Sequence, residues 1–337
     1  MSEESDPNVA YVLSLSGGAW RGALQYWLIV HLMSLHPYAA IAGVSVGSIN
    51  GIMAAMGKLD ELLKFWEGVD GLKGYLSFRW FYLICYALGI VALYEKLTKK
   101  PWMGGFYSMK PLHAKLLRDA HLSEIKTPFI AGVVSSNTGR YYNLDSRDMQ
   151  DDARLAIACL TSSCMSPFMT PPLLQLEPDS ELEAGFDGGG RNIFPVPTEA
   201  IAKLRAEGKK VIVHAIGCMP RNRIKEVSTL EVSGLIELAL RGLEILEAEV
   251  YEHDMMSDLR RAVGPGGEVH VWLPGEHPGA SFDADPKTIQ RRLQIGKDMV
   301  ATGPALILKG LAQEIDEDED EGDPESVVLV PPGEVPG

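Results

Sequence analysis

Three short segments of the sequence combine residue types suited to acyl transfer. The first is Gly43-Val44-Ser45-Val46-Gly47, a GxSxG motif between a short apolar run and a stretch with helical spacing. This strand–turn–helix context is that of a nucleophile elbow, in which a sharp turn exposes the serine hydroxyl. The following helix directs backbone N–H groups at developing negative charge. Ser45 is therefore predicted to be a nucleophile, and Gly43 and Gly47 to permit its turn.

The second segment is Ser16-Gly17-Gly18-Ala19-Trp20-Arg21-Gly22, at the end of another apolar run. A dinucleotide fingerprint would need glycine at position 19, and a phosphate loop would need Gly-Lys-Ser/Thr, so neither motif is present. Small residues let backbone N–H groups approach a ligand oxygen closely. We therefore predict an oxyanion hole formed by Gly17, Gly18 and Ala19. Ser45 lies 28 residues beyond Gly17, close to the length of one strand–helix–strand step.

The third segment is Phe186-Asp187-Gly188-Gly189-Gly190-Arg191. Alone, an aspartate followed by glycines indicates an Asx-turn in a surface loop. Beside the other two segments, it predicts Asp187 as a catalytic carboxylate, with Gly188 and Gly189 supporting a tight turn.

These segments need a scaffold that brings the ends of several strands together. Apolar runs predict strands at 10–15 and 38–44, and helical spacing predicts helices at 22–36 and 48–57. Such βαβα units give parallel strands whose functional loops gather at their carboxyl ends. Further elements are predicted along the rest of the chain: strands at 128–135, 141–144, 211–216 and 269–273, helices at 151–159, 229–262 and 285–311 with a break near Gly303-Pro304, and a Pro- and Ser-rich loop at 161–176.

The order GGxxRG, GxSxG and Asp-Gly-Gly resembles the patatin-like phospholipase family. Gly22-Ala23-Leu24-Gln25, Ser162 to Pro172 and Pro195-Val196 extend the likeness over residues 10 to about 200, and it weakens towards 310. The resemblance implies an α/β fold of three layers, with a mostly parallel central sheet flanked by helices. It also implies a domain at 10–311, with the motifs in 10–200 and an α/β extension at 201–311.

The resemblance further implies a Ser45–Asp187 dyad that hydrolyses lipid esters without histidine, metal or cofactor. Trp20, Arg21 and Gly22 would support the glycine loop, and we expect Arg21 to hold that loop rather than bind a lipid phosphate. The sequence departs from the family pattern at Ala19, where the third glycine of the loop is usual. If this position needs a positive φ, alanine costs about 1 kcal/mol there.

Two other readings stay open on the sequence alone. Ser…Asp…His is the chain order of α/β-hydrolases, and four histidines follow Asp187: His214, His253, His270 and His277. A signal-gated or membrane-binding scaffold with incidental turnover is the other alternative.

The composition and charge of the chain bear on its partners and its cellular compartment. The net charge is −14, but nine acidic residues lie in Glu314–Glu325, and without that segment the charge is −5. We predict a disordered arm at 1–9, a disordered acidic tail at 312–337 and no nucleic-acid partner. Four cysteines without metal spacing, and an N-terminus without signal-peptide character, favour a reducing, cytoplasmic setting.

The segment Trp80–Tyr94 has fifteen residues without a charge, flanked by Arg79, Lys96, Lys99 and Lys100. As one helix it would be about 22 Å long, too short for a hydrocarbon core of ~30 Å. It is either a buried helix or a lid that faces a membrane. We expect a lipid substrate and peripheral membrane contact through residues 78–100, because basic flanks suit phospholipid headgroups.

Overall fold

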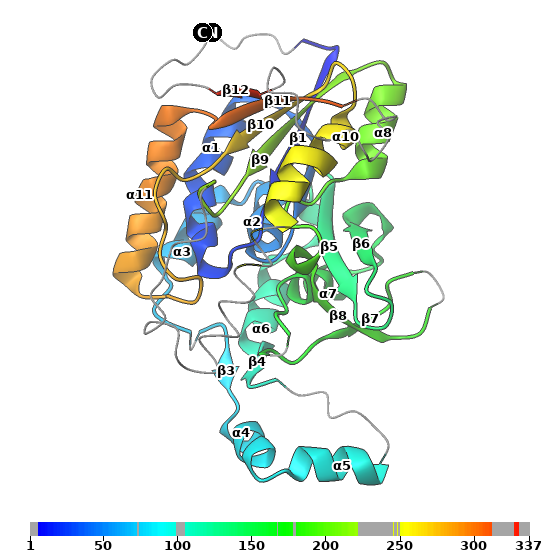
Figure 1. Ribbon diagram of the computed structural model, residues 1–337, viewed down its shortest axis with the longest axis vertical. Helices are drawn as coiled ribbons and strands as arrows, with labels where there is room; N and C mark the ends of the chain where they lie inside the picture. Colours follow the sequence, from blue (N-terminus) through cyan, green and yellow to red (C-terminus); the bar gives the residue numbers. More distant parts are fainter. Residues whose placement is uncertain are drawn as a thin grey trace.

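A mixed sheet of ten strands forms the centre of the molecule in the computed structural model (Figure 1). The structure describes residues 6–72, 74–98, 105–166, 168–177, 180–221, 245, 248, 250–311 and 327–329. The strands of this sheet are β1 (Val9–Leu15), β2 (Tyr38–Gly43), β5 (Phe129–Ser135), β6 (Tyr141–Asp145), β7 (Leu173–Leu174), β8 (Glu183–Asp187), β9 (Lys210–Ile216), β10 (Glu268–Trp272), β11 (Leu306–Lys309) and β12 (Val327–Leu329).

The sheet is parallel at its centre and antiparallel at its edges. Its order is β12-β11-β10-β9-β1-β2-β5-β8-β7, with β6 also paired to β5. The five strands from β10 to β5 run parallel to one another. Val12 and Leu13, consecutive on β1, are both fully buried, because helices cover both faces of the sheet.

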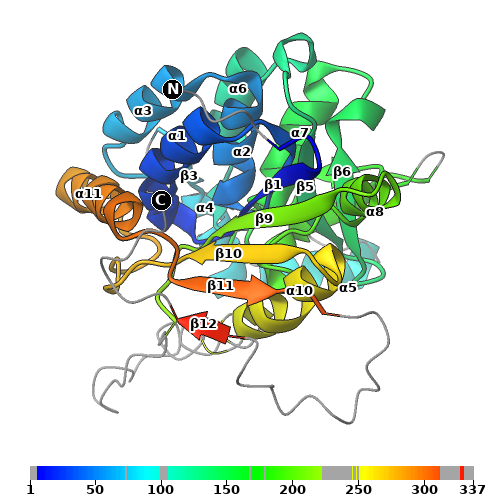
Figure 2. The same ribbon diagram turned by 90° about the horizontal axis from the view of Figure 1, so that it is seen from above.

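The helices divide between the two faces (Figure 2). Leu13 packs in a core with α1 (Gln25–Leu35), α2 (Val46–Met56), α3 (Leu59–Glu67), α6 (Lys110–Asp119), α7 (Asp152–Ser162) and α11 (Pro286–Thr302). Val12 packs on the opposite face with α8 (Thr198–Ala206), α10 (Leu259–Val263) and the π-helix Asp254–Asp258. The predicted α/β fold of three layers is confirmed.

The apolar segment at 80–94 is not a buried helix, so that reading is wrong. It forms two short helices, α4 (Trp80–Ala87) and α5 (Ile90–Thr98), joined through Gly89 at φ 67°. The short strands β3 (Ser77–Phe78) and β4 (Tyr107–Ser108) pair at their base. Trp80 and Leu97 are 67% and 73% exposed. Within the described residues, no helix has the length and apolar character needed to span a bilayer.

Two other predicted helices need correction. The break predicted near Gly303-Pro304 is confirmed, because α11 ends at Thr302 and Gly303 has φ 77°, but Leu306–Lys309 after it form the strand β11 and not a helix. The first helix begins only at Gln25, after a 3₁₀ turn at Ala19–Leu24.

Several predicted segments consist wholly or partly of residues that the structure does not describe. Most of the helix predicted at 229–262 lies outside the described residues, as do most of the arm at 1–9 and of the tail at 312–337. Where those two segments are described, Val9 begins β1 and Val327–Leu329 form β12. The division at residue 200 stays a prediction.

A cluster of histidines lies on the sheet face that α1 covers, with His214 buried and His36 and His270 half-buried. His214 on β9 is 2% exposed, and its Nδ1 lies 2.6 Å from the Tyr38 hydroxyl. The His214 ring stacks on His270 and meets His36 edge-on. Burial, followed by the charges of His270 and His36, holds the pKa of His214 well below its usual value.

We expect this cluster to make folding sensitive to acid. The unfolded chain takes up a proton near pH 6.5, whereas folded His214 stays neutral, so stability is lost as the pH falls below that value. The loss approaches about 1.4 kcal/mol per pH unit for a histidine that remains unprotonated. Denaturant unfolding of His214→Gln between pH 7 and 5 should show a flatter pH dependence than the wild type. An equal slope would remove His214 as the cause.

Candidate active site

Ser45 occupies a strained turn between β2 and α2. Its backbone lies at φ 56° and ψ −130°, and the residue is 8% exposed. Such conformations cost about 1–3 kcal/mol and persist where the surroundings enforce them. Only Ala19 shares a positive φ among the described non-glycine residues. The two departures from ordinary backbone geometry thus fall in two of the predicted motifs.

Three serine hydroxyls fix the backbone of Ser45. The Ser45 N–H donates to Ser162 Oγ at 3.1 Å, and that hydroxyl donates to the Gly132 carbonyl at 2.7 Å. The Ser45 carbonyl accepts from Ser48 Oγ at 2.6 Å and from Ser163 Oγ at 3.0 Å. These bonds hold Ser45 in its strained position.

Ser162→Ala should loosen this turn. It leaves the buried Ser45 N–H without its acceptor, which typically costs about 1–3 kcal/mol of folding stability. Thermal or denaturant unfolding should report that loss, and kcat should fall with it because Ser45 is less well held. A variant as stable and active as the wild type would contradict the role assigned to Ser162.

The predicted glycines of the turn allow close backbone contacts. A Cβ at Gly47 would lie 2.2 Å from the Leu15 carbonyl oxygen, and one at Gly43 would lie 2.1 Å from the Gly47 oxygen. A Cβ at Gly22 would lie 2.5 Å from a Val46 methyl group. Larger residues would push the glycine loop and the elbow apart.

The glycine loop presents unused backbone donors beside Ser45. Within the described part of the chain, the N–H groups of Gly17, Gly18 and Ala19 meet no hydrogen-bond acceptor. Gly18 has φ 153° and Ala19 has φ 49°. A Cβ at Gly17 would lie 3.1 Å from Ser45 Cβ. Ala19 thus adopts the left-handed conformation for which glycine is usual, so the strain expected at this position is present.

Two buried arginines anchor this loop to a distant segment. Arg21, 1% exposed, donates through Nε to the Gly279 carbonyl at 2.8 Å, and Trp20 N–H donates to Ser281 at 3.1 Å. Arg292, fully buried, donates to carbonyls of the same segment. Burial, and secondly the charge of Arg21, lowers the pKa of Arg292 to about 10. Arg21 thus links the glycine loop to this segment.

The sheet register places Asp187 level with Ser45. Gly43 on β2 pairs with Ala131 on β5, and Val133, two residues further, pairs with Asp187 on β8. Ser45 also lies two residues beyond Gly43. Asp187 Oδ1 accepts a hydrogen bond from Gly189 N–H at 2.8 Å, which orients the carboxylate. Gly188 is buried, and a Cβ there would lie 2.5 Å from the Gly132 oxygen.

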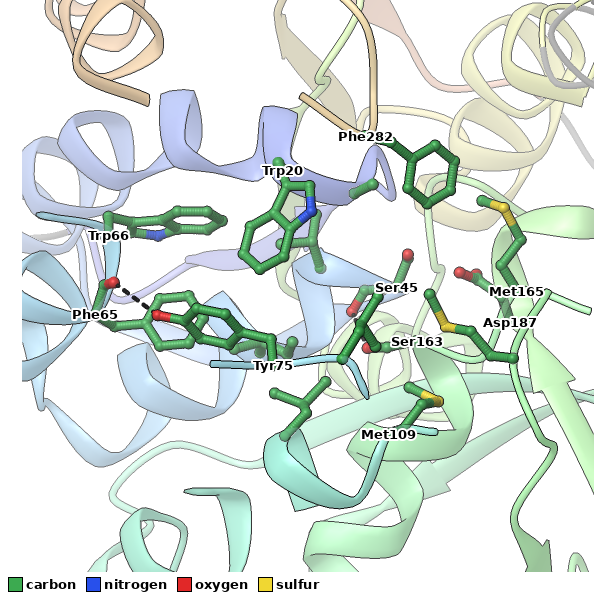
Figure 3. Close-up of a pocket in the computed structure, with 16 residues that line it drawn as sticks. Trp20, Ser45, Phe65, Trp66, Tyr75, Met109, Ser163, Met165, Asp187 and Phe282 are labelled. Carbon is green, nitrogen blue, oxygen red and sulfur yellow. Dashed lines mark hydrogen bonds between the residues drawn. The ribbon is translucent and has the colours of Figure 1, made fainter. Parts of the chain in front are cut away.

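Ser45 and Asp187 line two adjoining cavities. One, of about 600 Å³, is almost wholly apolar. Figure 3 shows Trp20, Phe65, Trp66 and Tyr75 gathered at one end of it, away from Asp187. The other, of about 1100 Å³, is more polar, and its lining includes Gly17, Gly18, Ala19, Ser45, Asp187, Gly189, Gly190, Arg191 and Ser281.

No histidine lines either cavity among the described residues. The four candidates are held elsewhere: His214 and His270 stack on each other, His253 lies near Asp258, and His277 Nδ1 accepts from Gly279 N–H. Burial, and then the charge of Asp187, raises the pKa of the Cys164 thiol to about 12, so this neighbour stays protonated.

Sequence reasoning missed several residues around the site. The run at 161–166 indicated a loop near the site, but not that Ser162 and Ser163 bind the backbone of Ser45. No sequence pattern singled out Tyr141, although its buried hydroxyl has no hydrogen-bond partner among the described residues. Burial, then Asp254 and Asp187, raises the pKa of Tyr141. Phe282 lines the apolar cavity through packing from a distant part of the chain.

Comparison with known proteins gives a family and two distant structures. VipD from Legionella pneumophila matches with a TM-score of 0.44 and 14% identity, over 88% of this chain and 66% of VipD. ExoU from the type III secretion system of Pseudomonas aeruginosa, solved in complex with SpcU, matches with a TM-score of 0.25 and 14% identity, over 75% and 54%. The chain thus spans just under two thirds of VipD. No curated protein sequence matches.

The family model for patatin-like phospholipases matches residues 13–200, more than half of the chain. The glycine loop, the serine elbow and the Asp-Gly-Gly turn all lie within that match. The chain belongs to the patatin-like phospholipase family, a family of lipid acyl hydrolases.

Proposed function

We propose that this protein hydrolyses carboxylic esters of phospholipids or lysophospholipids through a Ser45 acyl-enzyme, with Asp187 as the base. The observation that carries the proposal is a convergence. The two strained non-glycine residues, Ala19 and Ser45, line one cavity together with the carboxylate of Asp187. Strain that clusters in this way is typical of catalytic sites.

In the first half-reaction, Ser45 Oγ attacks the ester carbonyl carbon while Asp187 takes the hydroxyl proton. The carbonyl oxygen becomes an oxyanion that accepts hydrogen bonds from the N–H groups of Gly17, Gly18 and Ala19. One such donor is typically worth about 3 kcal/mol of barrier. The C–O bond to the leaving alcohol then breaks, and Asp187 returns the proton to that alcohol.

In the second half-reaction, water attacks the acyl-enzyme carbonyl and Asp187 accepts a proton from it. The same N–H groups hold the second oxyanion. The bond to Ser45 Oγ breaks, the serine regains its proton, and the fatty acid leaves. Arg21 and Arg292 are buried near the glycine loop. Their positive charges favour the negative charge of the oxyanion.

The two cavities differ in polarity, so each suits a different part of the substrate. The apolar cavity suits an acyl chain, because aromatic, methionine and aliphatic side chains make up nearly all of its exposed lining. The wider cavity suits the glycerol and the headgroup. Arg191 lines it, and the described residues give its guanidinium no hydrogen bond or ion pair. Guanidinium binds phosphate bidentately, which supports a phospholipid rather than a neutral ester.

Arg191→Gln should therefore reduce phospholipid hydrolysis selectively. We expect kcat/KM for a phospholipid to fall about 10- to 100-fold, since charge-assisted hydrogen bonds are worth roughly 1.5–3 kcal/mol, while a neutral ester is little affected. Arg140→Gln, at an exposed arginine outside both cavities, is the matched control. Equal losses on both substrates would contradict phosphate recognition by Arg191.

Lipid profiling tests the proposed function as a whole. Wild type and Ser45→Ala are incubated with mixed phospholipid vesicles and with monomeric esters, and the products are resolved by mass spectrometry. We expect free fatty acid and lysophospholipid from the wild type alone. Equal lipid profiles for the two proteins would overturn the proposal.

A further inference from the structure

The two helices α4 and α5 project from the body of the molecule as an apolar arm, defined here as residues 79–98. In Figure 1 they lie beyond the β3–β4 ribbon, apart from the sheet and the helices that cover it. Cys85 and Val91 are buried, but most of the arm's large apolar side chains are exposed. Such exposure costs free energy in water, and an exposed apolar patch of this kind is typical of a surface that binds a partner or a membrane.

Exposed apolar side chains concentrate in and next to this arm. The described part of the chain has fifteen large hydrophobic residues that are exposed, and five of them are scattered over other elements: Leu35, Leu117, Leu173, Leu182 and Ile245. The other ten lie within residues 78–97: Phe78, Trp80, Phe81, Leu83, Ile84, Leu88, Ile90, Leu93, Tyr94 and Leu97.

The arm is attached directly to the wall of the apolar cavity. Leu76 and Met109 line that cavity and lie immediately before β3 and after β4. Met169, also in the lining, bridges to Tyr107 of β4. Arg79 Nη1 donates to Thr170 Oγ1 at 2.9 Å, which fastens the base of the arm beside Met169. A surface that binds the arm therefore lies next to the acyl cavity.

The charge of this region is opposite to that of the whole chain. Residues 78–100 contain four basic residues and one acidic residue, a net charge of +3 in a protein with a net charge of −14. Amphipathic helices with aromatic and leucine residues and basic flanks bind in the interfacial plane of bilayers that contain anionic lipids.

We propose that the apolar arm docks the protein on an anionic phospholipid surface and so brings the bilayer next to the wall of the acyl cavity. The proposal rests on the proposed function for its choice of partner. A bilayer fits the arm because it offers both an apolar layer for the exposed side chains and anionic headgroups for Arg79 and Lys96.

The test separates docking from catalysis. Binding is measured by flotation with phosphatidylglycerol–phosphatidylcholine vesicles, using Ser45→Ala protein so that no lipid is consumed. The triple variant Leu88→Asp/Leu93→Asp/Leu97→Asp changes exposed residues alone. Leu117→Asp/Leu182→Asp, at exposed leucines outside the arm, is the matched control.

We expect the arm variant to lose at least about tenfold in vesicle binding, because charged residues replace apolar area that enters the interface. The control variant should bind normally. In proteins with intact Ser45, the arm variant should lose vesicle hydrolysis but keep hydrolysis of a monomeric short-chain ester. Binding should weaken at high salt and on phosphatidylcholine alone, since part of the attraction is electrostatic.

Undiminished vesicle binding by the arm variant would overturn the proposal. A dimer of the wild type that becomes a monomer in the variant, with vesicle binding retained, would assign the arm to contact between two copies instead. If vesicles bind through the arm but Ser45→Ala hydrolyses lipid as the wild type does, the proposed function fails and the docking stands.

Discussion

Asp187→Asn is expected to slow ester hydrolysis by about 10³–10⁴-fold, the range found when a general base or its orienting carboxylate is lost. Asparagine keeps the size of the side chain and can still accept the hydrogen bond from Gly189 N–H. It cannot take the proton of Ser45. Steady-state kinetics on a monomeric ester should therefore show the loss in kcat, with little change in the melting temperature.

The reason lies in the composition of the described site. Asp187 is the only carboxylate in the lining of either cavity, and no histidine shares that lining in the described part of the chain. Reaction of Ser45 with a fluorophosphonate probe should slow in parallel, because the probe also needs an activated hydroxyl. Ser166→Ala, at an exposed hydroxyl in the wider cavity, serves as the control. Near wild-type turnover by Asp187→Asn would mean that another base serves Ser45.

Gly18→Ala is expected to lower kcat by about 10²–10³-fold, the usual effect of losing one oxyanion-hole donor. Gly18 adopts φ 153°, and an added Cβ would lie 2.5 Å from Cys218 Cβ. The loop must shift, and its N–H groups move with it. Because the oxyanion forms only in the transition state, kcat should fall much more than KM rises.

Gly190→Ala is the matched control for the loop substitution. Gly190 lines the same wide cavity, but a Cβ there meets no atom within 4 Å. Its kinetics should stay close to those of the wild type. A Gly18→Ala enzyme that is folded and fully active would remove the glycine loop from the mechanism.

The sequence could single out the candidate site because its residues lie in turns at strand ends. Ser45 lies two residues beyond the end of β2, the loop at Gly17–Ala19 begins two residues beyond β1, and Asp187 is the last residue of β8, so local motifs carried most of the information. The strain at Ala19 was also foreseeable, because a glycine is usual there and the turn does not change with the residue.

The rest of the site depends on contacts that no local pattern encodes. Ser281 and Phe282 reach Trp20 and the apolar cavity from far along the chain, and Arg292 holds that segment in place. The apolar run at 80–94 was ambiguous for another reason. A segment without charged residues has no clear amphipathic period, so it does not reveal whether it is covered by protein or exposed.

The prediction of a helix beyond Gly303 is wrong for the same reason. Leu306, Ile307 and Leu308 fit a helix or a strand equally well by apolar content, and pairing with β10 decides between them. Sheet edges form through partners distant in sequence, and short apolar runs do not identify those partners.

The proposed mechanism forms a covalent intermediate in which the substrate acyl group is bonded to Ser45 Oγ, with Asp187 as the base. Its most direct test is peptide mass spectrometry of enzyme acid-quenched during turnover of an ester. We predict a fatty-acyl mass on the peptide that contains Ser45 in the wild type, and none in Ser45→Ala or Asp187→Asn. An acyl group on another residue, or full turnover by Ser45→Ala, would contradict the account.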